Sequence, residues 1–265
     1  MTNRKRIGLL DVVNAFRQIR LPLLLAFSDI RQRYRRSSLG PFWITLSMGV
    51  TIACIGLIFG NIFRAPMGQF LPFVSIGLIL WTFILTCLNE STVVFPQAQA
   101  IIKQLPIPLT SHVLRLLFRN FYIFLHNLLV LPIVFLFVRK TINLYFFLCL
   151  PGLLLVFANL FWMALLLGII CTRFRDLSQL VSSVLQIFFY ITPIIWMPTL
   201  LPEKAASMVL GPNPFFHLIS IIRDPLLGEI PSNLSYVYAI VLFIFGSTVT
   251  LWIFNRLKNK IAYWL

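Results

Sequence analysis

Charged residues, and acidic residues above all, are scarce in this chain of 265 residues. Aspartate and glutamate number seven in total, and charged residues make up 11% of the sequence, against about 25% in a soluble domain. The sequence also lacks a G-x-x-x-x-G-K-[ST] phosphate-binding loop, an H-E-x-x-H pair and a C-x-x-C pair. These absences exclude the usual nucleotide-hydrolysing, zinc-peptidase and redox-dithiol chemistries. We therefore expect no catalytic residue, metal site or cofactor on this chain.

Apolar residues dominate instead, at 59% of the sequence, and six long stretches carry no charged residue at all. Each can form a helix that crosses the roughly 30 Å hydrocarbon core of a bilayer, which takes about 20 apolar residues. We predict an all-α, polytopic membrane protein with an N-terminal segment at 1–36 and a transmembrane domain at 37–265. Its six transmembrane helices are expected at about 41–63, 70–88, 121–138, 144–171, 177–196 and 236–254.

The basic residues between these stretches are sorted by side. Seventeen of the 22 lysines and arginines fall in the N-terminus and in every second gap after it, and five fall in the alternate gaps. Because positive charge stays on the cytoplasmic side, both termini are predicted to be cytoplasmic. The net charge of +15 is then a topology signal that also attracts anionic membrane lipid, and we expect no nucleic-acid partner.

The N-terminal segment has the pattern of an amphipathic helix. Its apolar residues recur at helical spacing: Leu9, Val12, Val13, Phe16 and Ile19. Its polar residues would face the opposite way: Asp11, Asn14, Arg17 and Gln18. Such a helix lies in the plane of the membrane interface, and the alternative is a helix that packs against the bundle.

Two segments between the predicted spans should hold short helices. The loop at 90–119 mixes polar and apolar residues until Pro106 and Pro108 stop any helix, so a short helix across the cytoplasmic face is expected there. The external segment at 197–231 is rich in proline yet contains apolar pieces. Two short re-entrant helices before the last span fit this composition, and so does a folded external loop.

The predicted fifth span carries a polar stripe on one helical face, formed by Gln179, Ser182, Ser183, Gln186 and Tyr190. Because polar groups avoid lipid, this face should meet either a wet conduit or a neighbouring helix. The aromatic residues Trp81, Phe161 and Trp162 lie deep in other predicted spans. Their faces could stack against a passing sugar or simply pack the bundle.

A few single residues inside the spans have simpler expectations. Asn159, His126 and Asn127 should make hydrogen bonds between helices, and Gly56 and Gly60 form a G-x-x-x-G pattern for close helix contact. The carboxylate that ends the second span, Glu90, should pair with a nearby base rather than couple transport to an ion.

Four stretches, in order along the chain, resemble the ABC transporter permeases that export polysaccharides. They are RYRRSSLGPFW at 33–43, RFRD at 173–176, TPIIWMP at 192–198 and NPFFHLISIIRDPLLG at 213–228. The resemblance covers essentially the whole chain. It implies a homodimer in a bacterial inner membrane, with a channel for undecaprenyl-pyrophosphate-linked polysaccharide between the two copies. It also implies two copies of a separate ATPase subunit, which bind ATP and Mg²⁺.

The resemblance also implies roles for particular residues. The lipid pyrophosphate would dock on Arg33, Arg35 and Arg36 by charge attraction, unless these arginines serve topology alone. Sugar would pass along Gln179, Ser183, Gln186, Tyr190, Trp81, Phe161 and Trp162. The ATPase would contact Gln97, Ile101, Lys103, Gln104, Arg173, Arg175 and Asp176.

The leading hypothesis is thus the membrane subunit of an O-antigen exporter, and a capsular polysaccharide or wall teichoic acid exporter is the alternative. A membrane-embedded glycosyltransferase would need loop carboxylates that bind a metal and a nucleotide sugar, which the sequence lacks. An ion-coupled carrier would carry an acidic residue in mid-membrane and internal repeats, and the sequence shows neither.

Overall fold

The computed structural model describes the whole chain except residues 1–6, 36, 38–39, 41 and 142. The described residues form helices and contain no strand. In order, the helices are α1 (Ile7–Arg17), α2 (Arg20–Arg33), α3 (Phe42–Ile62), α4 (Met67–Ser91), α5 (Val94–Gln97), α6 (Gln99–Gln104), α7 (Leu109–Leu128), α8 (Val130–Val138), η2 (Leu144–Leu148), α9 (Cys149–Arg173), α10 (Leu177–Ile191), η3 (Pro198–Leu200), α11 (Glu203–Leu210), α12 (Pro214–Leu226) and α13 (Asn233–Trp264).

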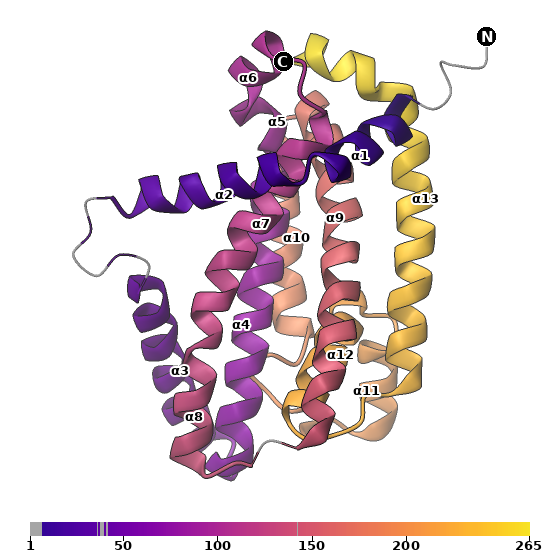
Figure 1. Ribbon diagram of the computed structural model, residues 1–265. Coiled ribbons are helices and arrows are strands. Elements are labelled where there is room, and N and C mark those ends of the chain that lie inside the picture. The colour runs from indigo at the N-terminus through magenta and orange to yellow at the C-terminus, as the bar shows by residue number, and fades with distance from the viewer. Residues whose placement is uncertain (1–6, 36, 38–39, 41, 142) are drawn as a thin grey trace.

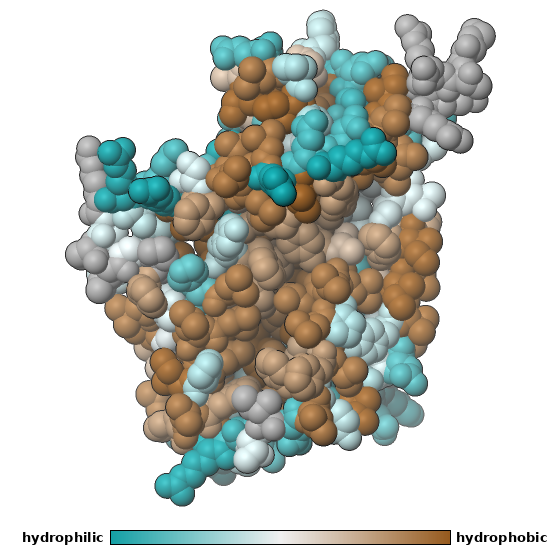
Figure 2. Space-filling model, viewed as in Figure 1, coloured by the Kyte–Doolittle hydropathy of each residue, from teal (hydrophilic) through white to brown (hydrophobic). Residues whose placement is uncertain are grey.

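Five helical stretches in the described part of the chain are long and apolar enough to cross a membrane. They are α3, α4, α7 continued by α8, η2 continued by α9, and α13. They run side by side as a bundle (Figure 1), and the middle of the bundle is covered by apolar side chains while polar side chains gather at its two ends (Figure 2). This arrangement confirms an all-α, polytopic membrane protein.

The third long stretch begins earlier than the sequence predicts. The helix starts at Leu109 rather than near 121, because the charged residues Arg115 and Arg119 continue it instead of ending it. Both arginines are paired with carboxylates from other helices, so their charges are compatible with a helix that packs in the bundle. Pro108 precedes the first turn, where the missing N–H of a proline costs no helical hydrogen bond.

The predicted span at 177–196 is shorter than expected. Helix α10 has 15 residues and ends at Ile191, which corresponds to about 22 Å of helix at 1.5 Å per residue. Thr192 leaves the helix with ψ 134°, because Pro193 disfavours helical geometry in the residue before it. The chain then turns back into the protein, where Ile194 is fully buried.

Helix α4 is the centre of the core, and α3 stands at its edge. Within the apolar 18-residue stretch that could cross the membrane, 83% of the α4 residues are buried but only 11% of the α3 residues. The two helices meet along the predicted glycine pair. A Cβ atom on Gly56 would collide with Leu71 Cδ1, and one on Gly60 would lie 2.7 Å from Met67 Sδ. The close contact predicted from the G-x-x-x-G pattern is therefore confirmed.

Two short helices precede α13, as the sequence predicts. Helices α11 and α12 follow each other closely and differ in direction by 107°. The side chain of Asn213 caps α12 by accepting hydrogen bonds from the backbone N–H groups of Phe215 and Phe216. Buried Arg223 donates from Nη1 to the carbonyl of Pro193 at 2.6 Å and lies over the ring of Phe73 at 4.0 Å. These contacts hold the bent pair against the bundle.

The N-terminal segment forms two helices, and one predicted orientation is wrong. Helix α1 buries Gly8, Asp11 and Ala15 against the bundle, so Asp11 does not face away from the protein. The apolar residues Leu9 and Phe16 are instead 41% and 46% exposed. This outward apolar face fits an interfacial helix, and the buried polar residue is explained by the ion pair described below.

Candidate functional site

One end of the bundle gathers the elements for which the sequence predicts contacts with other molecules. Helices α1, α2, α5 and α6, the turn at Arg173–Asp176 and the C-terminus lie there (Figure 1). We call this region the basic end. Gln99 Nε2 donates to the carbonyl of Leu265, and the Arg173 guanidinium lies 5.1 Å from the ring centre of Trp264. Residues far apart in sequence therefore form one surface.

The short helix α6 is poorly covered by the rest of the chain. None of its residues is buried. Lys103 and Gln104 are exposed and Ile101 is half-buried, and Gln97 at the end of α5 is exposed as well. Pro106 and Pro108 follow α6, as predicted. A helix with apolar and polar residues and no buried face is well suited to bind another protein.

The turn between α9 and α10 projects a second exposed element. Arg173 ends α9 and Asp176 precedes α10. Arg173, Arg175 and Asp176 are exposed, and Phe174 between them is 54% exposed. Ser178 Oγ donates to the carbonyl of Arg175 at 2.7 Å, which fixes the shape of the turn.

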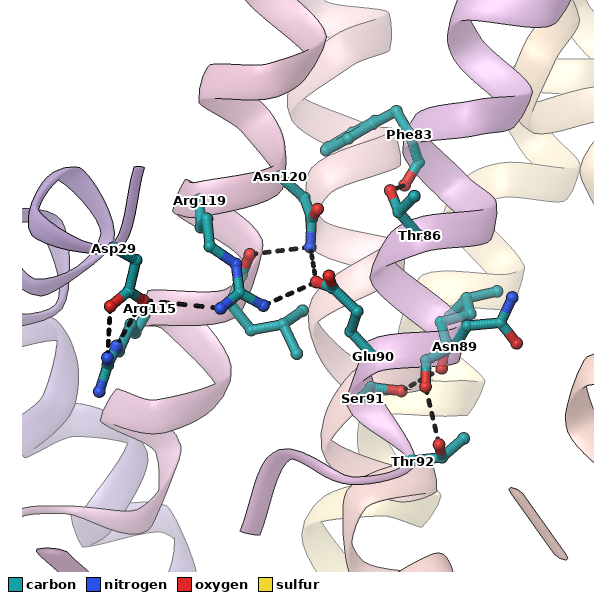
Figure 3. Close-up of polar contacts among 12 residues, drawn as sticks. Asp29, Phe83, Thr86, Asn89, Glu90, Ser91, Thr92, Arg115, Arg119 and Asn120 are labelled. Carbon is teal, nitrogen blue, oxygen red and sulfur yellow. Dashed lines mark hydrogen bonds and ion pairs between the residues drawn. The ribbon is translucent and has the colours of Figure 1, made fainter. Parts of the chain in front are cut away.

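A network of ion pairs joins three helices beneath this surface (Figure 3). Asp29 of α2 accepts a hydrogen bond from Arg115 Nε at 2.8 Å and pairs with Arg119 Nη1 at 3.6 Å. Arg119 Nη2 in turn lies 2.7 Å from Glu90 Oε2 at the end of α4, which also accepts from Asn120 Nδ2 at 2.6 Å. The predicted pairing of Glu90 with a local base is thus confirmed. The sequence did not reveal Asp29, because a single carboxylate in a basic run carries no pattern.

A buried carboxylate, that of Asp11, anchors α1. Asp11 Oδ1 and Oδ2 accept the backbone N–H groups of Thr110 and Leu109, at 3.0 and 3.1 Å, and Lys258 Nζ lies 2.9 Å from Oδ2. The carboxylate therefore caps the N-terminus of α7, where unpaired N–H groups and the helix dipole favour a negative charge. Gly8 N donates to Asn255 Oδ1 of α13 at 2.8 Å. Together these contacts tie α1 to α7 and α13.

The predicted docking arginines lie at the far end of α2. Arg33 and Arg35 are exposed, and α2 lies across the long helices (Figure 1). Arg36 lies outside the described residues. The two described arginines are thus available to an anion.

The polar stripe lies on the outside of the chain. Gln179, Ser183, Gln186 and Tyr190 are all exposed, whereas Leu185 is buried. Ser182 alone among the stripe residues reaches a neighbouring helix, through a 3.0 Å hydrogen bond from its Oγ to Asn89 Oδ1. The stripe as a whole is therefore not explained by packing within one chain.

The predicted aromatic residues do not join this stripe in one surface. Trp81 is 3% exposed and packs against Phe189 and Phe215 in the core, so a sugar does not reach it in this conformation. Phe161 contacts Phe16 of α1 at 5.4 Å between ring centres. Trp162 is half-buried and donates from Nε1 to Asn159 Oδ1 at 3.1 Å. The structure thus shows packing roles for all three.

The single polar residues of the spans have different partners. Asn159 Nδ2 donates to the carbonyl of Ala239 in α13 at 3.1 Å, which confirms the predicted bond between helices. The His126 ring instead contacts the carbonyl of Tyr122 in its own helix, at 2.8 Å. The Asn127 side-chain oxygen is buried without a partner in the described chain, so the predicted interhelical bond is absent there.

Comparison with known proteins identifies the family. Residues 23–227 match the ABC-2 type transporter family, which is most of the chain and includes both exposed elements of the basic end. The chain belongs to the ABC-2 type transporter family. The long apolar helices of the structure are therefore those of a membrane transporter subunit.

Several curated relatives of this ABC-2 type chain carry one name. An "O-antigen export system permease protein RfbA" of Klebsiella pneumoniae is 28% identical over 251 residues, which cover 91% of this chain and 93% of the relative. A second protein of that name from the same organism is 26% identical over 250 residues, with the same coverage. A protein of that name from Myxococcus xanthus is 27% identical over 206 residues, 76% of this chain and 77% of the relative.

Proposed function

We propose that this ABC-2 type chain is the membrane subunit of an ATP-driven exporter of undecaprenyl-pyrophosphate-linked O-antigen in a bacterial inner membrane. Two copies form the channel, and two copies of a separate ATPase subunit bind ATP and Mg²⁺ and drive it. The termini and the basic end face the cytoplasm. The names of the relatives, which align over nearly the whole chain, support the substrate class.

The observation that carries the channel proposal is the exposed polar stripe on α10. Gln179, Ser183 and Gln186 lie on a mostly apolar helix and are exposed, with no covering neighbour in the described chain. Moving an amide from water into hydrocarbon without a partner costs about 4 kcal/mol or more. A stripe of this kind is therefore stable only against protein or water. A second copy that brings its own stripe nearby creates a polar passage, and Tyr190 adds an aromatic face for sugars.

The exposed elements of the basic end support an ATPase partner. The chain has no phosphate-binding loop of its own, so the energy of ATP reaches it through contact with another subunit. Helix α6 has no buried residue, the turn at Arg173–Asp176 is exposed, and the two elements contact the adjacent residues Leu265 and Trp264. Gln97, Ile101, Lys103, Gln104, Arg173, Arg175 and Asp176 form this contact in our proposal.

The arginines at the end of α2 provide a docking point for the lipid pyrophosphate. Arg33 and Arg35 are exposed at the C-terminal end of α2, which projects away from the long helices (Figure 1), and Arg36 follows them in sequence. Guanidinium groups form strong, paired hydrogen bonds with phosphate oxygens. The substrate would bind here before its sugar enters the passage.

The test is the location of lipid-linked glycan in cells depleted of this chain. We expect glycan to accumulate inside the cytoplasmic membrane and to disappear from the cell surface, and a plasmid-borne copy should restore both. Normal surface glycan in depleted cells would show that polysaccharide export is not the function. Chemical analysis of the accumulated glycan distinguishes O-antigen from capsular polysaccharide and teichoic acid.

A further inference from the structure

The last turns of α13 continue past the predicted membrane span and lie on the basic end. The span is expected to end near 254, but the helix continues to Trp264, and its end lies next to α6 (Figure 1). Apolar residues recur through these turns at helical spacing and form one face, at Phe254, Leu257, Ile261 and Trp264. Phe254 and Ile261 are fully buried, so this face holds residues 254–265, the C-terminal segment, against the protein.

Helix α6 depends on the C-terminal segment for its position. Apart from α5, which it follows directly, α6 packs chiefly against α13 in the described chain. Gln99 Nε2 donates to the carbonyl of Leu265, and both residues are half-buried. Isolated helices shorter than about 12 residues are marginal in water. A helix of six residues with none of them buried therefore needs this contact to keep its place.

The same segment contacts the turn at Arg173–Asp176. The Arg173 guanidinium lies 5.1 Å from the ring centre of Trp264 and 5.2 Å from that of Phe174. Both distances are within the roughly 6 Å at which an aromatic face attracts a cation. Trp264 and Leu265 also pack against the hydrophobic core. Because consecutive Cα atoms are about 3.8 Å apart, two adjacent residues link the turn to α6 with little freedom between them.

We propose that the C-terminal segment holds α6 and the turn at Arg173–Asp176 together as one docking surface for the ATPase subunit, with Trp264 and Gln99 as positioning residues. The inference rests on the proposed function, because it requires that subunit. If the two elements moved separately, binding would have to order them and would lose affinity. A surface that is ordered beforehand avoids this loss. It also transmits a displacement of the ATPase to both elements at once.

The first experiment measures hydrogen–deuterium exchange of the peptide that contains α6, in the full-length chain in nanodiscs without the ATPase. Trp264→Ala removes the ring beside Arg173, and Gln99→Leu removes the donor to the Leu265 carbonyl. Each variant should raise the exchange rate of this peptide at least threefold, because a less supported helix opens more often. Exchange in α4 should be the same in every variant, which shows that the bundle is folded.

Two further variants serve as controls. Trp264→Phe keeps an aromatic face beside Arg173 and should leave the exchange rate of α6 within twofold of the wild type. Tyr263→Ala changes the neighbouring side chain, which is 88% exposed, and should have no effect on α6. Unchanged exchange in both Trp264→Ala and Gln99→Leu would overturn the proposal, even if either variant bound the ATPase less well, because the loss would then come from a direct contact.

The second experiment measures the dissociation constant between the same variants and the ATPase subunit. Trp264→Ala and Gln99→Leu should raise it at least fivefold, while Trp264→Phe and Tyr263→Ala should stay within twofold of the wild type. Faster exchange in α6 with unchanged affinity would also overturn the proposal, because docking would then not depend on the order of this surface.

The two experiments separate this inference from the proposed function. If the wild-type chain does not bind the ATPase at all, the proposed function fails and the docking role fails with it. If the wild type binds and the two positioning variants bind equally well, the subunit assignment stands and only the role of the C-terminal segment is wrong.

Discussion

At the scale of single residues, the buried carboxylate of Asp11 and the half-buried carboxylate of Asp29 hold the basic end together. Asp29 and Asp11 each bind partners from helices that are distant in sequence. Their contacts differ in kind, since Asp29 binds arginine side chains while Asp11 binds backbone N–H groups and a lysine. Both belong to the N-terminal helices, so these polar contacts add to the apolar packing of Ala15, Ala26 and Ile30 against the bundle.

Removing the Asp11 carboxylate should detach α1. We expect Asp11→Ala to lower the free energy of unfolding by about 2 kcal/mol, because the N-terminus of α7 loses its cap and the Lys258 ammonium loses its partner. Asp11→Asn keeps one acceptor oxygen and should lower the free energy of unfolding by less than Asp11→Ala does. The measurement is unfolding by SDS in mixed micelles, with Asn14→Ala, on the exposed side of α1, as the control. Equal stability of Asp11→Ala and the control would show that the contact adds no stability.

A glycine in α9 marks the tightest contact between that helix and α12. A Cβ atom on Gly152 would lie 2.6 Å from the backbone oxygen of Ile221, and a backbone atom cannot rotate away. Gly152→Ala should therefore destabilise the protein by about 1–3 kcal/mol through overpacking. Gly68→Ala in α4 meets open space and should be neutral or slightly stabilising. A ranking of the two variants by thermal unfolding in detergent checks this, and a stable Gly152→Ala would contradict the contact.

At the scale of helices, the uncharged apolar runs predicted which long helices form the bundle, but they predicted poorly where some of these helices begin and end. The runs without charge located α3, α4, α9 and α13. They missed the first turns of α7, because Arg115 and Arg119 look like a loop until Asp29 and Glu90 are seen to neutralise them. They overextended α10, because the apolar run continues past Ile191 while Pro193 ends the helix. Contacts between distant residues decide such cases, and no local pattern contains them.

The site was predictable to a similar degree. Exposure of α6 and of the turn at Arg173–Asp176 agrees with elements chosen from sequence, and the polar stripe is exposed as a conduit or an interface requires. The depth of Trp81 in the core could not be read from its sequence position, because its neighbours in α4 are nearly all apolar.

The polar face of α10 gives a prediction at this scale. We expect Gln186→Leu combined with Tyr190→Leu to reduce export at least tenfold, because sugar hydroxyls lose hydrogen-bond partners along the passage. Membrane insertion and ATPase binding should be unchanged, since both side chains are exposed and lie in the half of α10 that is further from the turn at Arg173–Asp176. The measurement is surface glycan in a strain that carries only the variant. Ile187→Val, at a neighbouring exposed position, is the control, and full export by the double variant would exclude this face from the passage.

At the scale of the whole molecule, polar residues gather at the two ends of the bundle and differ in kind. The basic end carries α5 and α6, and the opposite end carries the bent pair α11 and α12 (Figure 1). An asymmetric distribution of charge fixes the orientation of such a protein in a membrane. It follows that each end meets a different compartment and different molecules.

This orientation can be measured with single cysteines. In a Cys54→Ser background, which removes the exposed native thiol, Ser207→Cys on α11 should react with a membrane-impermeant maleimide in intact spheroplasts. Lys103→Cys on α6 should react only after permeabilisation, because the basic end faces the cytoplasm in our proposal. Both positions are exposed in the structure. The reverse pattern of labelling would invert the proposed topology.

The contacts of α1 and α2 also impose an order on biogenesis. Asp29 binds Arg115, which is synthesised 86 residues later, and the backbone N–H of Gly8 binds Asn255, which is synthesised 247 residues later. Helix α2 can therefore bind α7 midway through synthesis, whereas α1 acquires its contacts with α13 only after the last long helix has been made. Until their partners are made, α1 and α2 would lie on the lipid surface, for which their outward apolar residues are suited. Synthesis of α13 therefore allows the last contacts of the basic end to form, and binding of other subunits there would follow it.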